Sequence, residues 1–80
     1  MELDARTVRI IKQLTGKNVL DYDRVSSLHE IPLSTLDIGR KLALIHGGMI
    51  PAIQLLRYVS KCTLAEAVQF LNGTQIANGE

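Results

Sequence analysis

Apolar residues recur every three or four positions through most of the chain, which is the spacing of one face of an α-helix. The first such stretch begins at Leu3 or Asp4 and ends at Leu14, and basic residues occupy its other side. Its apolar positions are Ala5, Val8, Ile11 and Leu14, widened by Ile10. Gly16 follows, and glycine readily adopts the left-handed conformation that ends helices. The pattern therefore predicts a first helix that ends at Leu14.

The segment from Lys17 to Leu33 has a weaker pattern. Asp21 is placed to cap a short helix from Tyr22 to His29. Pro32 would end this part of the chain, because the residue before a proline avoids helical angles. The expected inward positions of this segment are Leu20, Val25 and Leu28.

A third helix is predicted to begin at Ser34, with Asp37 three residues later as the acidic partner of a capping box. Its apolar face consists of Leu36, Ile38, Leu42 and Ile45, with Leu44 nearby. Gly39 inside this helix costs about 1 kcal/mol relative to alanine, so we expect another helix to cross close to it. Gly47 and Gly48 would end the helix.

The last third of the chain predicts a helical hairpin. Pro51 fits the first turn of a helix that begins near Ile50, because a proline's missing N–H is harmless there. Thr63 and Glu66 have the spacing of a capping box that opens the final helix. The expected inward residues are Ala52, Ile53, Leu55, Leu56, Val59, Leu64, Ala67, Val68 and Leu71. Asn72-Gly73 is expected to end this helix.

No stretch alternates between apolar and polar residues as a strand would. We therefore predict an all-α fold, an orthogonal bundle of four or five short helices that ends in a helical hairpin. A single domain would span residues 1–73, and residues 74–80 would form a disordered tail. A chain of 80 residues has a small core, and such cores are often completed by self-association or by a partner.

The hairpin segment resembles a known domain. The run Gly47–Arg57, followed by Leu64–Ala67, is similar to the helical hairpin of the C-terminal domain of the bacterial ribosomal stalk protein. The similarity extends from Gly47 to Leu71 and implies a hairpin geometry and a tendency to dock proteins. Lys61 stands in place of the family's turn glycine, and Ala65 and Val68 replace its exposed lysines. The basic helical face that helps the stalk protein to dock translation factors is therefore missing.

Charge and cysteine content narrow the function classes. Nine basic and eight acidic residues leave a net charge of +1, which counts mildly against a general nucleic-acid or membrane-surface binder. No apolar stretch approaches the roughly 20 residues that cross a bilayer. Cys62 is the one cysteine, so it cannot form an internal disulfide, and this suits a reducing cytoplasm. We expect a cytoplasmic protein that does not bind membranes.

The sequence offers little for catalysis. His29 lies beside Glu30, and His46 lies at the expected end of the third helix, where the helix dipole alone favours a histidine. No residue is placed to form a nucleophile pair with Cys62. The acidic residues of the middle segment, Asp21, Asp23 and Glu30, do not have the spacing of a calcium loop. We therefore expect no enzyme activity, no metal site and no cofactor.

Nucleic-acid binding is one interpretation of the pattern. The run from Val25 to Leu36 resembles a helix-turn-helix, a short helix and an Ile-Pro turn before a second helix. That second helix, from Ser34 to Lys41, would carry the residues Ser34, Thr35, Arg40 and Lys41 near a groove, although Asp37 would repel phosphate. The basic residues of the first helix, Arg6, Arg9 and Lys12, would contact phosphates.

Protein binding is the leading hypothesis. The side chains of Leu33, Tyr58, Phe70 and Ile76 fall at the ends or edges of the predicted helices, where an apolar group can stay exposed. Tyrosine in particular is a frequent anchor of interfaces. We predict a small module that binds an unidentified protein partner or associates with itself through apolar helical surface. The expected surface comprises Arg57, Tyr58 and Lys61, together with the basic side of the first helix.

Overall fold

The computed structural model describes residues 3–45 and 47–79. In these ranges the chain forms α-helices and short 3-10 turns, and no strand. The helices are α1 (Ala5–Thr15), α2 (Leu33–Leu44), α3 (Met49–Val59) and α4 (Leu64–Gly79), and the 3-10 turns are η1 (Val19–Asp21) and η2 (Leu28–Glu30). The predicted all-α class is confirmed.

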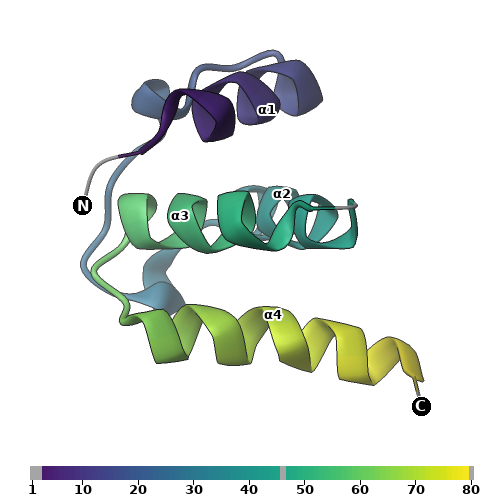
Figure 1. The fold of residues 1–80 in the computed structure, drawn as a ribbon. Coiled ribbons are helices and arrows are strands. Elements are labelled where there is room, and N and C mark those ends of the chain that lie inside the picture. Colours follow the sequence, from purple (N-terminus) through teal and green to yellow (C-terminus); the bar gives the residue numbers. More distant parts are fainter. Residues whose placement is uncertain (1–2, 46, 80) are drawn as a thin grey trace.

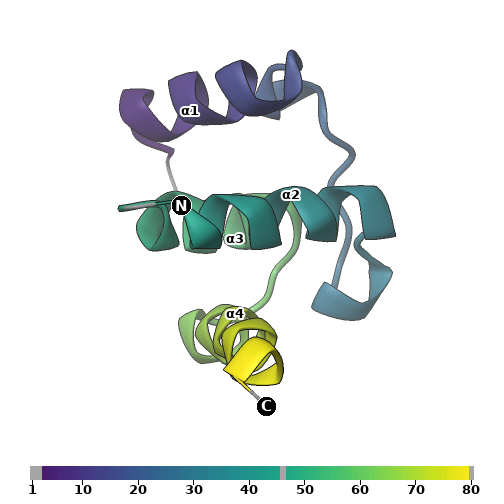
Figure 2. The same ribbon diagram turned by 90° about the vertical axis from the view of Figure 1, so that its right-hand side faces the viewer.

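The helices lie in three layers. Both views show α1 on one side, α2 and α3 in the middle, and α4 on the other side (Figures 1 and 2). Figure 1 shows α4 along its length, whereas Figure 2 shows it end-on and shows α2 along its length, so α2 and α4 cross. The central helix α3 contacts α1, α2 and α4. The bundle is therefore built around α3.

The core is mostly aliphatic. Its fully buried side chains are Ile11, Val19, Leu42, Ala52, Leu55, Leu56, Val59, Ala67 and Leu71, and Tyr22, Ile31 and Cys62 are almost as deeply buried. Four of these residues belong to α3, because this helix is covered on three sides. Burying such side chains contributes about 1.5–3 kcal/mol each relative to leaving them in water.

The ends of α1 follow the local sequence. The Thr7 backbone N–H donates to Asp4 Oδ1 at 2.7 Å, so Asp4 caps the first turn, and Gly16 ends the helix at φ +74°. Inside the fold, Thr7 Oγ1 donates to Gln54 Oε1 of α3 at 2.7 Å, and Gln54 Nε2 donates to Asp4 Oδ2 at 3.2 Å. These polar contacts attach α1 to α3. Two expected core positions of α1 are wrong, because Ala5 is exposed and Leu14 is 39% exposed.

The helix expected from Tyr22 to His29 is wrong. The chain instead forms η1, whose N–H of Leu20 donates to Asn18 Oδ1 at 2.9 Å, and then an extended stretch before η2. The physical reason lies in α3, because the Val25 N–H donates to the Val59 carbonyl at 2.7 Å and is taken out of any local helix. Leu20 is 64% exposed, so its expected inward position is also wrong.

The start of α2 differs from the prediction in its cap. Pro32 occupies the N-cap position, and no side chain accepts a hydrogen bond there, so the expected capping box from Ser34 is wrong. Gly39 behaves as expected: it is buried, with Leu56 of α3 packed against it. Ile45, predicted on the apolar face, is 45% exposed, and the neighbouring Leu44 is 63% exposed, so this end of the predicted face is wrong.

The hairpin of α3 and α4 is confirmed. Pro51 lies in the first turn of α3. The capping box of α4 is complete, since the Thr63 N–H donates to Glu66 Oε1 at 2.9 Å and the Glu66 N–H donates to Thr63 Oγ1 at 3.1 Å.

Two details of α4 differ from the prediction. Leu64 is 53% exposed, not inward as predicted. The predicted end at Asn72-Gly73 is also wrong, because α4 continues to Gly79. A glycine inside a helix costs only about 1 kcal/mol, and no proline follows it. Disorder of residues 74–80 stays a prediction.

Candidate functional site: a basic cleft beside Tyr58

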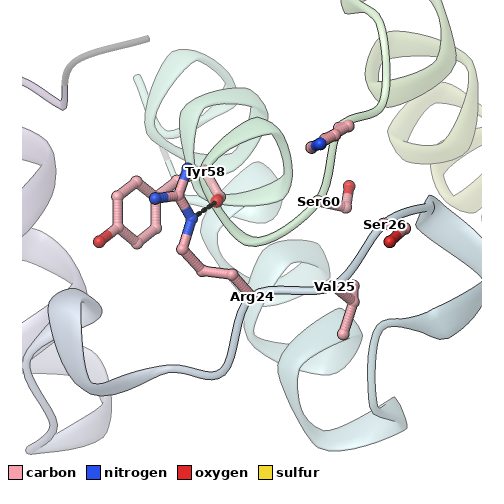
Figure 3. Close-up of a pocket in the computed structure, with 6 residues that line it drawn as sticks. Arg24, Val25, Ser26, Tyr58 and Ser60 are labelled. Atoms are coloured by element: carbon pink, nitrogen blue, oxygen red, sulfur yellow. Dashed lines mark hydrogen bonds between the residues drawn. The ribbon is translucent and has the colours of Figure 1, made fainter.

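A cleft of about 350 Å³ lies between the extended stretch that precedes η2 and the end of α3 (Figure 3). It is lined by Arg24, Val25, Ser26, Tyr58, Ser60 and Lys61, and this set is called the basic cleft below. The two sides come from segments more than thirty residues apart in the chain, and the Val25–Val59 hydrogen bond holds them together. The fold, not a local motif, therefore creates the cleft.

Arg24 makes two contacts with the same residue. Its Nε donates to the Tyr58 carbonyl oxygen at 3.1 Å, and its guanidinium carbon lies 4.6 Å from the centre of the Tyr58 ring. Figure 3 shows the guanidinium group against the Tyr58 ring. A cation over an aromatic face contributes about 0.5–1 kcal/mol at an exposed site. The two contacts orient the ring and the guanidinium of the cleft together.

Ser60, which lines the basic cleft, is held by hydrogen bonds at the end of α3. Ser60 is only 3% exposed, and its Oγ donates to the Leu56 carbonyl at 2.9 Å while the Cys62 N–H donates to Ser60 Oγ at 3.4 Å. The Cys62 thiol is buried and lies 3.7 Å from the same carbonyl of Leu56. Both side chains lie within bonding distance of the Leu56 carbonyl oxygen near the end of α3. We therefore assign them a structural role beside the cleft.

The charge of the basic cleft has one sign. Arg24 and Lys61 are cationic and exposed, and among the described residues that line the cleft none carries a carboxylate. Guanidinium and ammonium groups favour carboxylate or phosphate ligands through charge-assisted hydrogen bonds. Nε of Arg24 is used by the Tyr58 carbonyl, which leaves the two Nη groups of its planar fork for such a ligand. The arrangement suits the binding of an anionic group beside an aromatic ring.

The basic cleft contains part of the surface predicted from the sequence. Tyr58 and Lys61 line it together, whereas Arg57 is half-buried outside it, with its Nε buried and without a hydrogen-bond partner among the described residues. Arg24 is the residue that the sequence reasoning missed. It belongs to a segment interpreted as a helix, and nothing local indicates that it contacts Tyr58.

The residues expected at a nucleic-acid surface are divided between two helices. Arg6, Arg9 and Lys12 are all exposed on α1. On α2, Ser34 and Lys41 are exposed, but Thr35 is 5% exposed, and Arg40 is paired with Asp37 at 3.3 Å and lies over the Phe70 ring at 4.9 Å. At the position predicted for the first helix of the helix-turn-helix, the chain forms only the single 3-10 turn η2.

The other residues considered as candidate sites lie outside the basic cleft. His29 borders a separate hollow of about 330 Å³ with Leu28, Glu66, Gln69 and Phe70. Within residues 3–45 and 47–79, no three histidine, cysteine or acidic side chains come close enough to hold a metal ion. His46 and the side chain of Ile76 lie outside the described residues. None of the described helices has the length and apolar character needed to cross a membrane.

Compared with protein family models, with curated proteins and with solved structures, the chain matches none of them. The resemblance of Gly47–Leu71 to the stalk-protein hairpin therefore stays a hypothesis. The function has to be argued from the residues of the fold itself.

Proposed function

We propose that this chain is a small, non-enzymatic interaction module of the cytoplasm that binds an acidic segment of a partner protein in the basic cleft. The observation that supports the proposal is the composition of the cleft. Tyr58 supplies an aromatic surface, and Arg24 and Lys61 supply two cations from opposite sides. Tyrosine and arginine are among the residues enriched at the energetic centres of interfaces.

An acidic peptide fits the basic cleft better than an apolar one. The fork of Arg24 can take a carboxylate in a bidentate contact, and Lys61 adds a second point charge. Ser26 lies on the same wall as Arg24 and has a hydroxyl that can hydrogen-bond to a peptide. The apolar part of a bound side chain would lie against the Tyr58 ring.

The first test uses a hexaglutamate peptide as the probe. We expect saturable changes in the amide NMR signals of residues 24–26 and 58–61, and no such changes with hexalysine. Lys61→Gln should weaken binding several-fold, while Lys12→Gln, an equally conservative change on exposed α1, should leave it unaltered. Binding that is lost in Lys12→Gln and kept in Lys61→Gln would contradict the cleft proposal.

Nucleic acid is the second candidate, favoured by the exposure of Arg6, Arg9 and Lys12 along α1. The two candidates separate in a pulldown from native lysate that is split into nuclease-treated and untreated halves. A protein partner that survives nuclease and is lost with Tyr58→Ala supports the basic cleft. Recovery of nucleic acid that falls steeply with salt and is abolished by Arg6→Glu, Arg9→Glu and Lys12→Glu would favour α1 instead.

A further inference from the structure

The outward face of α2 is a mixed apolar and charged stripe. Leu33 is 75% exposed and Leu44 is 63% exposed, and they lie at the two ends of this helix. They are eleven positions apart, which is about three helical turns, so both point to the same side. Figure 2 shows α2 in front of α3, with no other described helix in front of it. The two exposed leucines therefore lie on one line of the helix surface.

Charged residues lie between the two leucines. Asp37 and Lys41 occupy the middle turns of the same face, and Asp37 is 60% exposed in its side chain, while Arg40 pairs with Asp37 of its own chain and lies over the Phe70 ring of α4. The outward face of α2 is therefore leucine, acid, base, leucine along the chain. When the helix is turned end for end, a leucine still lies at each end, but the acid and the base exchange places.

A second α2 laid antiparallel on the first satisfies this order. When Leu33 lies beside Leu44 of the second copy, Asp37 lies beside Lys41 of that copy. A two-fold axis then repeats every contact, which is the requirement of an interface between identical chains. Leucine meets leucine and acid meets base, with no like charges forced together at Asp37.

The end of α2 also provides a hollow for an apolar side chain. A hollow of about 270 Å³ lies near the end of α2 and is lined by Ala43, Ile45, Gly47, Met49 and Ile50. Ile50 is 66% exposed and Ile45 is 45% exposed, so the hollow has an apolar rim. In the antiparallel arrangement, Leu33 of the second copy reaches this end of the helix. A projecting leucine at one end and an apolar hollow at the other are complementary in such a pair.

We propose that the chain forms a homodimer in which the outward faces of two α2 helices pack antiparallel about a two-fold axis. The contact strip is about 18 Å long and about 10 Å wide. Its area of about 180 Å² per partner is smaller than the roughly 800 Å² per partner of a standard interface. The dimer is therefore weak, with a dissociation constant in the micromolar range or above, and it uses residues other than those of the basic cleft.

Sedimentation of the full chain at concentrations up to about 1 mM tests the dimer. Leu44→Gln should raise the dissociation constant at least about tenfold. Leu20→Gln is the matched control, because Leu20 is 64% exposed in η1 and lies off α2. It should leave the dissociation constant unchanged. Circular dichroism of both variants confirms that the helices are intact.

A charge exchange tests the register and does not depend on loss of binding alone. Asp37→Lys places a lysine beside Lys41 of the second copy, and Lys41→Asp places two acids together, so each variant by itself should be monomeric. Mixed one to one, the two variants restore both opposite-charge contacts and should form a heterodimer. A mixture that associates also shows that each variant is folded.

Three outcomes would overturn the proposal. The first is a wild-type chain that stays monomeric at the highest concentration, whether or not another protein binds the same face. The second is a dimer that Leu44→Gln leaves as tight as before. The third is a mixture of the two charge variants that associates no better than either alone. None of these outcomes bears on peptide binding in the basic cleft.

Discussion

Gly39 of α2 faces Leu56 of α3 so closely that a methyl group at Gly39 would lie 3.4 Å from Leu56 Cδ2. That distance is an ordinary van der Waals contact, so the crossing admits an alanine and no more. Gly39→Ala should therefore stabilise the fold by about 0.5–1 kcal/mol, the helix-propensity difference between the two residues. Urea unfolding of both proteins measures this change in the free energy of unfolding. A loss of more than about 1 kcal/mol would mean that the two helices cannot adjust at all.

Gly48 gives the opposite prediction. A Cβ at this position would overlap the carbonyl oxygen of Leu42, which belongs to the backbone and cannot turn away. Gly48→Ala should cost about 2 kcal/mol or more, or prevent the turn between α2 and α3 from closing. Gly16→Ala is the control, since Gly16 has a left-handed φ but open space around it. Its cost should stay near 1 kcal/mol, and equal losses in the two variants would contradict the overlap.

The two hydroxyl residues expected to cap helices should differ in their effect. Thr63→Ala removes the acceptor for the Glu66 N–H and should cost about 1 kcal/mol of stability. Ser34→Ala should cost little, because Ser34 lies inside the first turn of α2 and makes no capping bond. Thermal unfolding of the two variants side by side measures the difference. A larger loss for Ser34→Ala would restore the capping box predicted from the sequence.

Asp4 makes the stability of α1 sensitive to acid. The backbone N–H of Thr7, followed by the side chain of Gln54, lowers the pKa of Asp4 from its ordinary value of 3.8. A carboxyl with a lowered pKa stabilises the folded state fully at pH values above this ordinary pKa, which the unfolded chain keeps. That contribution is lost as the pH falls through the folded pKa. The difference in melting temperature between wild type and Asp4→Asn should therefore be greatest near neutral pH and shrink below pH 3.8. A difference that does not change with pH would contradict this role.

The first helix and the hairpin can be predicted because their signals are local. Asp4 and Gly16 limit α1 by hydrogen bonds within a few residues, and Thr63 and Glu66 form their box within one turn. The middle segment cannot be predicted in this way. Its Val25 N–H binds the carbonyl of Val59, so a contact across the fold replaces the helix that local spacing favours.

The basic cleft was predictable only in part, for the same reason. Tyr58 and Lys61 are three residues apart around the end of α3, so one pattern indicates both. Arg24 comes from 34 residues earlier, and its contact with Tyr58 depends on how the extended stretch lies against α3. Arg57 is half-buried and outside the cleft, because helical spacing gives a side chain's direction and not what covers it.

The position of α3 between the other three helices also bears on the order in which the chain folds. The α2–α3 and α3–α4 pairs are neighbours in sequence, while the Thr7–Gln54 bond closes a loop of 47 residues. Loop closure of that length is an entropic cost that local pairs avoid. We expect α2, α3 and α4 to assemble in the transition state and α1 to dock afterwards. Thr7→Val should then speed unfolding and leave the folding rate nearly unchanged. A slower folding rate would place α1 in the nucleus.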